Sequence, residues 1–220
     1  MTSDVLSFLT EFVRHPLTTG AVAPSGRTLA GRITTPVPRT GSPCVVELGP
    51  GTGAFTAPIH RLLADGGRHV AVEVNARFVR RLARRYPSLE LHHADATELG
   101  ALDLPPADAV ISGLPWTVFP AARQDTILDA VRDLLTDAGT FTTFAYVHAA
   151  WTPPGRRLRT ALHARFEEVV PGRTVWSNLP PAFVYHARRP IRRSLEGVPV
   201  GAAPGDAGRG LVRETGPRPG

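Results

Sequence analysis

The stretch Glu47-Leu48-Gly49-Pro50-Gly51-Thr52-Gly53 decides the fold class of this chain. It continues a short apolar run, 44–48, that is typical of a buried strand, and it precedes a segment, 57–64, whose pattern predicts a helix. Glycines at such a junction let the backbone approach a ligand closely, and the start of the helix offers unpaired N–H groups. The stretch therefore predicts a ligand-binding loop between a first strand and a first helix.

Strand and helix signals alternate after this loop, which indicates βαβ units. Strands are expected at 69–74, 89–92, 109–112 and 140–147, and helices at 76–86, 123–135 and 157–164. Segments 166–170 and 183–187 predict two late antiparallel strands. The fold class expected is α/β: a Rossmann-like, doubly wound, mostly parallel sheet with an antiparallel edge, preceded by N-terminal helices.

The two ends of the chain have different patterns. Residues 3–14 predict an amphipathic helix and 25–33 a second, short one, so 1–40 is expected to form a helical lid or cap. Asp4, Glu11 and Arg14 give the polar face of the first helix a net charge of −1, which favours a lid over a membrane anchor. The α/β domain is assigned to 41–190, and the Gly- and Pro-rich segment 191–220 is expected to be a disordered basic tail.

The composition excludes several classes of protein. Of 220 residues 42% are hydrophobic and 20% charged, and no run approaches the roughly 18 apolar residues of a membrane span. The first residues lack the basic start of a secretory signal. A single cysteine, Cys44, excludes a disulfide framework and a multi-thiolate zinc site. We expect a cytoplasmic protein without a metal, with peripheral membrane association as the alternative.

The net charge of +6 is unevenly distributed along the sequence. All 25 basic residues are Arg, which points to GC-rich coding as one source of the basicity. Residues 1–150 carry 13 Arg against 14 acids, whereas 151–220 carry 12 Arg against 5 acids. The excess of positive charge therefore lies in the last third of the sequence. The Arg pairs at 156–157, 188–189 and 192–193 in this region could bind lipid phosphates.

Acidic residues around the glycine loop narrow the choice of ligand. Gly49 to Ala54 also satisfies the dinucleotide fingerprint in its GxGxxA form, and Glu73, 20 residues after Gly53, could accept hydrogen bonds from ribose hydroxyls in either case. Glu47 would repel a pyrophosphate but suits a ligand that ends in an ammonium group. These features favour S-adenosylmethionine over NAD; the alternative is a structural glycine turn with surface acids.

Asp95 and Ala96 follow the third predicted strand, on the rim where ligands sit in such sheets. The Asp95 carboxylate could accept a hydrogen bond from an adenine amino group, and the Ala96 N–H would face the ring. This pair completes a nucleoside site with the glycine loop.

Residues 43–147 resemble a class I S-adenosylmethionine-dependent methyltransferase, and the chain more narrowly resembles the bacterial phospholipid N-methyltransferases, relatives of the rRNA adenine dimethylases. The resemblance covers about residues 5–188. The matching segments are Phe8-Leu9, Pro16, Gly20-Ala21-Val22-Ala23-Pro24-Ser25, Val45-Val46-Glu47-Leu48-Gly49-Pro50-Gly51-Thr52-Gly53, Ser112-Gly113-Leu114-Pro115 and Val175-Trp176-Ser177-Asn178-Leu179-Pro180-Pro181-Ala182. It implies a seven-stranded fold, with Glu47, Gly49, Gly51 and Gly53 at the methionine and ribose end, Glu73 on the ribose and Asp95 on the adenine.

Ser112-Gly113-Leu114-Pro115-Trp116 follows the fourth strand and is the expected acceptor site. Adenine dimethylases carry Asn-Leu-Pro-Tyr/Phe here; Gly113 lacks the side-chain amide that holds the base, so nucleic acid is not the expected partner. Trp116 keeps a face for stacking or for cation–π attraction. The backbone carbonyls of Ser112 and Gly113 could hold an amine, and Tyr146 or His148 is the candidate base.

The resulting prediction is a methyltransferase that uses S-adenosylmethionine to methylate an amine, such as the phosphatidylethanolamine headgroup. A small-molecule N- or O-methyltransferase of specialised metabolism is the second reading, because acceptor pockets diverge on this fold. An RNA adenine methyltransferase is the third. Trp151 and Trp176, together with Trp116, could line an acceptor pocket, with a core position as the alternative for each.

Overall fold

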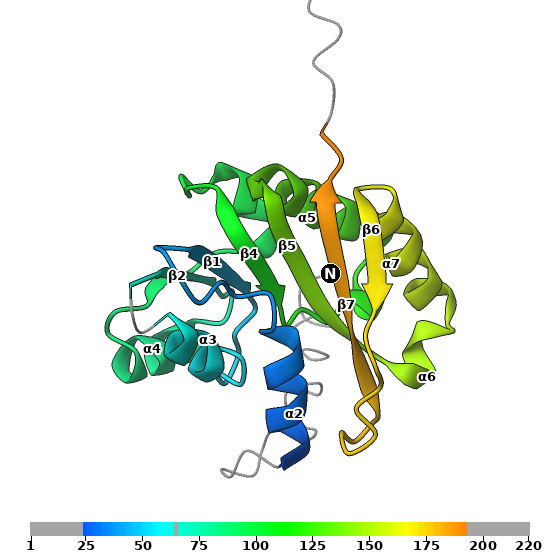
Figure 1. Cartoon of the computed structure of the whole chain (residues 1–220), viewed down its shortest axis with the longest axis horizontal. Coiled ribbons are helices and arrows are strands. Elements are labelled where there is room, and N and C mark those ends of the chain that lie inside the picture. The colour runs from blue at the N-terminus through cyan, green and yellow to red at the C-terminus, as the bar shows by residue number, and fades with distance from the viewer. Residues whose placement is uncertain (1–23, 64–65, 193–220) are drawn as a thin grey trace, which may run out of the picture.

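The computed structural model describes residues 24–63 and 66–192 and contains a seven-stranded sheet in the order β3-β2-β1-β4-β5-β7-β6 (Figure 1). Neighbouring strands pair in parallel from β3 through β5, and β7 runs antiparallel to both of its neighbours. The predicted fold class is therefore confirmed. The strands are β1 (Cys44–Leu48), β2 (Arg68–Val72), β3 (Glu90–His92), β4 (Ala107–Ser112), β5 (Leu135–Tyr146), β6 (Phe166–Pro171) and β7 (Ala182–Pro190).

Helices cover both faces of the sheet, as the βαβ alternation requires (Figure 1). One face carries α2 (Pro24–Ile33), α3 (Thr56–Leu62) and α4 (Ala76–Arg85), and the other carries the 3₁₀ helix η1 (Ala96–Ala101), α5 (Ala121–Leu134) and α7 (Pro153–His163). Two single turns, η2 (Trp116–Val118) and α6 (Val147–Ala150), follow β4 and β5. The carboxyl ends of the parallel strands lie at the lower edge in Figure 1, beside α2 and the loop between β6 and β7.

Helix α2 is part of the core of the domain. Leu29 and Ile33 are buried against Val45 of β1 and Val184 of β7, and the hydroxyl of Thr142 donates a hydrogen bond of 2.9 Å to the Ile33 carbonyl. The boundary expected at residue 40 therefore divides one hydrophobic core. The lid helix expected at 3–14 lies outside the described residues.

The folded part also extends beyond residue 190, where the sequence predicts the tail to begin. The Ile191 N–H donates to the Arg165 carbonyl at 2.9 Å. The Arg192 guanidinium donates to the Leu135 carbonyl and to Asp137, at 2.7 Å each. The expected tail is thus two residues too long at its start, and its remainder, 193–220, lies outside the described residues. No helix within 24–63 and 66–192 is long and apolar enough to cross a bilayer.

Candidate functional site

The glycine loop joins β1 to α3 in a conformation that needs glycine. Gly49, Gly51 and Gly53 have φ angles of 66°, 56° and 91°, a region that residues with a side chain rarely adopt. The Gly49 N–H donates to the Val72 carbonyl of β2 at 2.9 Å, which fixes the start of the loop to the sheet. No atom beyond its chain neighbours lies within 4 Å of the place where a Gly51 Cβ would stand, so the loop presents open space there.

Glu47 is fully buried beneath the loop. Its Oε2 accepts a hydrogen bond of 2.8 Å from the Thr56 hydroxyl at the start of α3 and lies 3.3 Å from Nε2 of the buried His69, outside hydrogen-bonding geometry. Its Oε1 has no hydrogen-bond partner among the described residues. Since an unsatisfied buried carboxylate oxygen is costly, Glu47 retains the capacity to accept a bond from a cationic ligand or a water.

Glu73 lies directly after β2 and holds the loop in place. Its Oε2 accepts from the Gly51 N–H at 3.0 Å and its Oε1 from the Asn75 N–H at 2.7 Å. Burial raises the pKa of this carboxyl, although the hydrogen bonds from the backbone counteract part of the rise. Each carboxylate oxygen has two lone pairs, so the side chain could accept ribose hydroxyls while it braces the loop.

Asp95 caps η1 and meets an arginine that the sequence did not connect with it. Its Oδ1 accepts from the N–H and the hydroxyl of Thr97, at 2.9 and 2.8 Å, and its Oδ2 lies 2.6 Å from Nη2 of Arg123 on α5. Burial tends to raise its pKa, but the bonds from Thr97 and Arg123 outweigh burial and leave the pKa below its ordinary value. A carboxylate at this position stays ionised and can accept from an amino group.

Gly113 lies against the glycine loop. A Cβ on Gly113 would stand 2.7 Å from the Gly49 carbonyl oxygen and 3.6 Å from Cε2 of Phe55. The Gly113 N–H donates to the Leu48 carbonyl at 2.8 Å. The end of β4 therefore has no room for a side chain at residue 113, and an asparagine there would require the two segments to separate.

Residues 45–139 match a family described as "Methyltransferase domain". The chain is 28% identical over 192 residues to an ornithine lipid N-methyltransferase of Singulisphaera acidiphila, an alignment that covers 84% of this chain and 96% of that protein. This chain is a class I S-adenosylmethionine-dependent methyltransferase.

Two further relatives of this methyltransferase differ in how much of it they match. Ribosomal RNA small subunit methyltransferase A of Burkholderia thailandensis is 40% identical, but over only 82 residues, 34% of this chain and 30% of that protein. The structure of the N-methyltransferase NodS from Bradyrhizobium japonicum in complex with S-adenosylhomocysteine has a TM-score of 0.61 at 16% identity and covers 82% of this chain and 96% of NodS. The structural likeness concerns the fold alone.

The cofactor of the methyltransferase is S-adenosylmethionine, and the geometry around the glycine loop fits it. The open space over Gly51 could receive the ligand, and the free oxygen of Glu47 suits its ammonium end. Asp95 and the adjoining Ala96 stand at the end of β3, on the same edge of the sheet as Glu73. Within the described residues, no three His, Cys, Asp or Glu side chains gather closely enough to hold a metal ion.

The expectation that Trp116 offers a stacking face to the acceptor is wrong. Its side chain is only 2% exposed and packs edge-to-face against Phe119 and Phe141 in the core of the methyltransferase. Its indole N–H donates to the Ser112 hydroxyl at 3.1 Å. The turn η2 directs the ring inward because a hydrogen-bond acceptor and two aromatic neighbours are available there.

Other parts of the expected acceptor site are also inaccessible. Ser112 is fully buried, so its carbonyl, which accepts a hydrogen bond of 3.3 Å from the Thr143 hydroxyl, is not exposed to an acceptor amine in this structure. Pro115 is buried as well, whereas Gly113 and Leu114 are half-buried and remain at the rim.

An aromatic row that was only partly predicted runs along this rim. Tyr146, at the end of β5, stacks on the exposed His148 with ring centroids 5.8 Å apart. Phe144 contacts Tyr146 edge-to-face at 5.5 Å and Phe55 of the glycine loop at 6.1 Å. Sequence reasoning missed Phe55 and Phe144, although Phe144 shares the alternating face of its strand with Tyr146, a signal that could have found it.

Trp151 and Trp176 are exposed on the surface. They are 73% and 72% exposed, so neither is the core residue considered as the alternative.

Proposed function

We propose that this methyltransferase transfers the methyl group to an amine carried by a membrane lipid, such as the headgroup of phosphatidylethanolamine or of an amino-acid-containing lipid. The observation that carries the proposal is the match to the ornithine lipid N-methyltransferase over 96% of that protein's length. The match to the ribosomal RNA enzyme covers only 30% of its length.

The contact between Gly113 and the Gly49 carbonyl supports an acceptor other than RNA. Adenine dimethylases hold their base with an asparagine at this place, and a side chain here would collide with the glycine loop at 2.7 Å. A small primary amine needs no such side chain, because its N–H groups can be held by a backbone carbonyl. The half-buried Gly113 is the residue we assign to this role.

The cofactor would be held by the residues around the glycine loop. Glu47 and Gly51 would meet its methionine end, Glu73 the ribose, and Asp95 with the Ala96 N–H the adenine. Bound S-adenosylmethionine supplies a methyl group already activated by the sulfonium. The protein's share is then to place an unprotonated amine in line with that group, which can contribute about 7–11 kcal/mol.

Proton removal from the amine does not need Tyr146. Burial raises the pKa of this phenol, so it stays protonated at neutral pH and cannot serve as the base. The Tyr146 ring instead forms the rim with Phe144 and Phe55, where aromatic faces attract the cationic methylated product. His148, exposed beside Tyr146, can pass the proton to water.

Incubation with isotopically labelled S-adenosylmethionine tests the proposal. Vesicles of phosphatidylethanolamine, vesicles containing ornithine lipid, small-subunit ribosomal RNA and a polar extract are offered separately. Phosphatidylcholine is the matched control, since its nitrogen has no lone pair. We expect label in one or both amine lipids and none in phosphatidylcholine. Label confined to RNA or to the polar extract would refute a lipid acceptor.

A further inference from the structure

The arginines of this protein differ in how often they meet an acid when they are placed on the fold. Of the eight described arginines between 156 and 192, five form ion pairs: Arg157 and Arg165 contact Asp125 of α5, at 2.5 and 3.1 Å, Arg192 contacts Asp137 at 2.7 Å, and Arg188 and Arg189 face Glu168 and Glu167. Arg156, Arg159 and Arg173 form no ion pair among the described residues. The helices α2, α3 and α4, which share the opposite face of the sheet, contain no Asp or Glu at all. Among the described residues, no ion pair is formed by Arg27, Arg32, Arg39, Arg61, Arg77, Arg80, Arg81, Arg84 and Arg85, which we call the arginine face.

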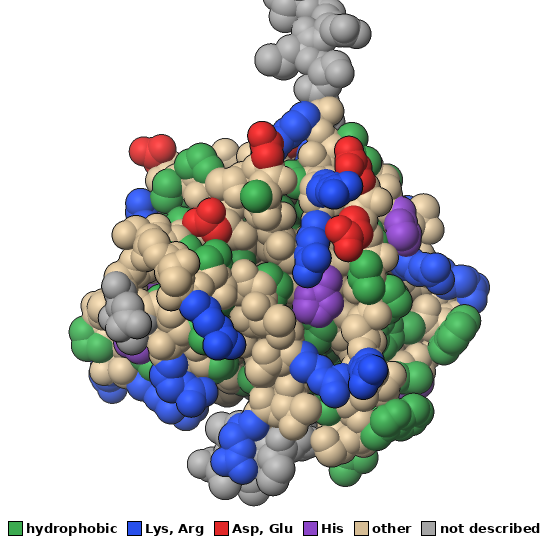
Figure 2. Space-filling model, viewed as in Figure 1, with side chains coloured by type: hydrophobic (Ala, Val, Ile, Leu, Met, Phe, Trp, Pro, Cys, Tyr) green, Lys and Arg blue, Asp and Glu red, His purple; other side chains and the backbone are tan. Residues whose placement is uncertain are grey.

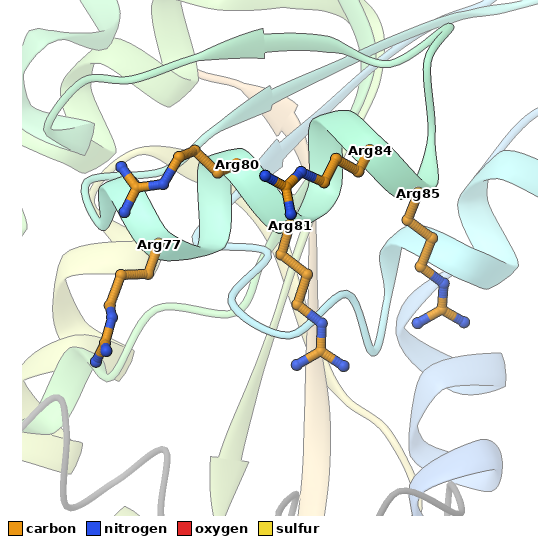
Figure 3. A pocket seen from close by; sticks show the side chains of 5 residues that line it. All are labelled: Arg77, Arg80, Arg81, Arg84 and Arg85. Atoms are coloured by element: carbon orange, nitrogen blue, oxygen red, sulfur yellow. The ribbon is translucent and has the colours of Figure 1, made fainter.

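Helix α4 concentrates this charge. Its five arginines are exposed and line a surface hollow of about 520 Å³ (Figure 3). Arg77, Arg81 and Arg85 are spaced at i, i+4 and i+8 and extend side by side from one side of the helix. Like charges at this spacing destabilise a helix, and α4 is held instead by its Asn75 cap and its buried Leu82. The stripe therefore opposes folding and is better explained by an anionic partner.

A second hollow continues the arginine face between α2 and α3. It measures about 340 Å³ and is lined by Arg39 and Arg61 together with Thr34 and Thr35. On the face shown in Figure 2, blue side chains occur in both halves, whereas the red acidic side chains lie in the upper half. The lower half of this face, where the parallel strands end, therefore shows basic side chains without acidic ones among the described residues.

Of the six large apolar side chains that are exposed among the described residues, four follow or connect elements at the same edge, whereas Val170 lies within β6 and Ile191 follows β7. Val74 follows β2 and is 44% exposed, Trp151 follows α6, and Trp176 and Leu179, 72% and 74% exposed, stand in the loop between β6 and β7. We call these four residues the apolar tips. A guanidinium N–H of Arg32 on α2 donates to the Arg173 carbonyl in that loop. This bond connects α2 of the arginine face with the loop that carries Trp176 and Leu179.

We propose that this surface docks on an anionic lipid bilayer, with the arginine face on the lipid phosphates and the apolar tips in the interfacial layer. The presence of both arginines and apolar side chains on this surface favours a membrane as the binding partner. Clustered arginines alone would suit any polyanion, but Val74 and Leu179 have no ring for stacking on bases, and tryptophan is enriched where membranes meet water. The choice of a membrane over another polyanion rests on the proposed lipid acceptor.

Binding of the full-length protein to vesicles tests the inference. Vesicles of phosphatidylglycerol and phosphatidylcholine are compared with pure phosphatidylcholine by sedimentation at 0.1 M salt. The test variant is Arg77→Gln with Arg81→Gln; its matched control, Arg188→Gln with Arg189→Gln, removes the same charge from arginines that face Glu168 and Glu167. All variants keep residues 1–23 and 193–220, so any contribution from these segments cancels.

We expect the test variant to bind anionic vesicles about 25-fold more weakly, since each arginine near such a surface contributes about five-fold. The control should change less than about two-fold. Trp176→Ser with Leu179→Ser should weaken binding on the order of ten-fold at every salt concentration, whereas the effect of the arginines should shrink as salt rises. Quenching of tryptophan fluorescence by brominated lipid should also disappear with Trp176→Ser and Trp151→Ser, because Trp116 is buried.

Equal losses of vesicle affinity in the test and control variants would overturn the inference. Wild-type protein that does not bind anionic vesicles more tightly than pure phosphatidylcholine would overturn it as well. Tighter binding to a ribosomal RNA fragment than to vesicles, lost with the same arginines, would overturn it in favour of a polynucleotide. Methylation of detergent-dispersed lipid is measured in parallel. Arginine-dependent vesicle binding without any methylated lipid would refute the proposed function and leave the docking surface supported.

Discussion

The contact between Gly113 and the glycine loop gives a substitution whose effect follows from two distances. In Gly113→Ala the new Cβ would stand 2.7 Å from the Gly49 carbonyl oxygen, closer than Cβ atoms approach in real structures. Relief requires the end of β4 and the glycine loop to separate by about half an ångström, and overpacking of this kind costs about 1–3 kcal/mol. Because Gly49 belongs to the loop that would hold the cofactor, we expect a loss of cofactor affinity of similar size, about 5- to 150-fold.

Calorimetric titration with S-adenosylhomocysteine, together with chemical denaturation, measures both consequences of Gly113→Ala. Gly100→Ala is the matched control, since the nearest atom to its Cβ is Ala130 Cβ at 3.8 Å, an ordinary contact. The control should bind as the wild type does and unfold within about 0.5 kcal/mol of it. If Gly113→Ala bound with wild-type affinity and stability, the close approach would carry no functional constraint. The argument against an asparagine, and with it the structural case against an RNA acceptor, would then fail.

Three further substitutions test the environment of single side chains. Trp116→Phe should lower the free energy of unfolding by about 1–2 kcal/mol, because it removes the hydrogen bond to Ser112 and leaves a small cavity. The KM for the acceptor should stay unchanged. A raised KM at unchanged stability would show that Trp116 contacts the acceptor. Tyr146→Phe should keep kcat within a few-fold at neutral pH, and a loss of a hundred-fold or more would identify the phenol as the base. A folded pKa of Glu73 above its ordinary value of 4.5 means that its contribution to stability is present below pH 4.5 and lost as pH rises through the raised pKa. Thermal melts of the apo protein should therefore show a smaller fall over that range in Glu73→Gln than in the wild type, and parallel curves would contradict the sign.

Much of the fold could be predicted because periodicity and glycine placement are local signals. The strand expected at 140–147 and the helix expected at 123–135 both exist, but the strand begins at Leu135, where the helix has ended. Strand β7 was expected to end at 187 and reaches Pro190. The local pattern fails after His186, and β7 continues because Arg188 pairs with Thr140 of β5 and Glu168 of β6, and Pro190 with Phe166 of β6.

The residues of the candidate site also differ in whether local sequence or tertiary contacts determine their positions. The glycine loop, Glu73 and Asp95 could be placed from the sequence because each follows directly from a strand end in a parallel sheet. Trp116 could not, since its burial depends on Phe141 of β5, 25 residues further along the chain, and on the Ser112 hydroxyl. Arg123 was missed for the same reason: α5 brings it to Asp95 across 28 residues of sequence.

The number of charged residues in each part of the sequence does not predict where charge lies on the folded surface. The last third carries the larger excess of arginine, yet topology lays α7 on α5, so that Arg157 and Arg165 meet Asp125 and part of the excess is neutralised there. Residues 1–150 are nearly neutral in sum, yet right-handed βαβ crossovers place α3 and α4, both without acids, on one face. Mutational bias toward arginine codons would enrich both faces alike and does not explain why three helices on one face contain arginine but no acid. A cause that acts on the folded surface would explain it, and an anionic partner on the α2–α4 face is such a cause.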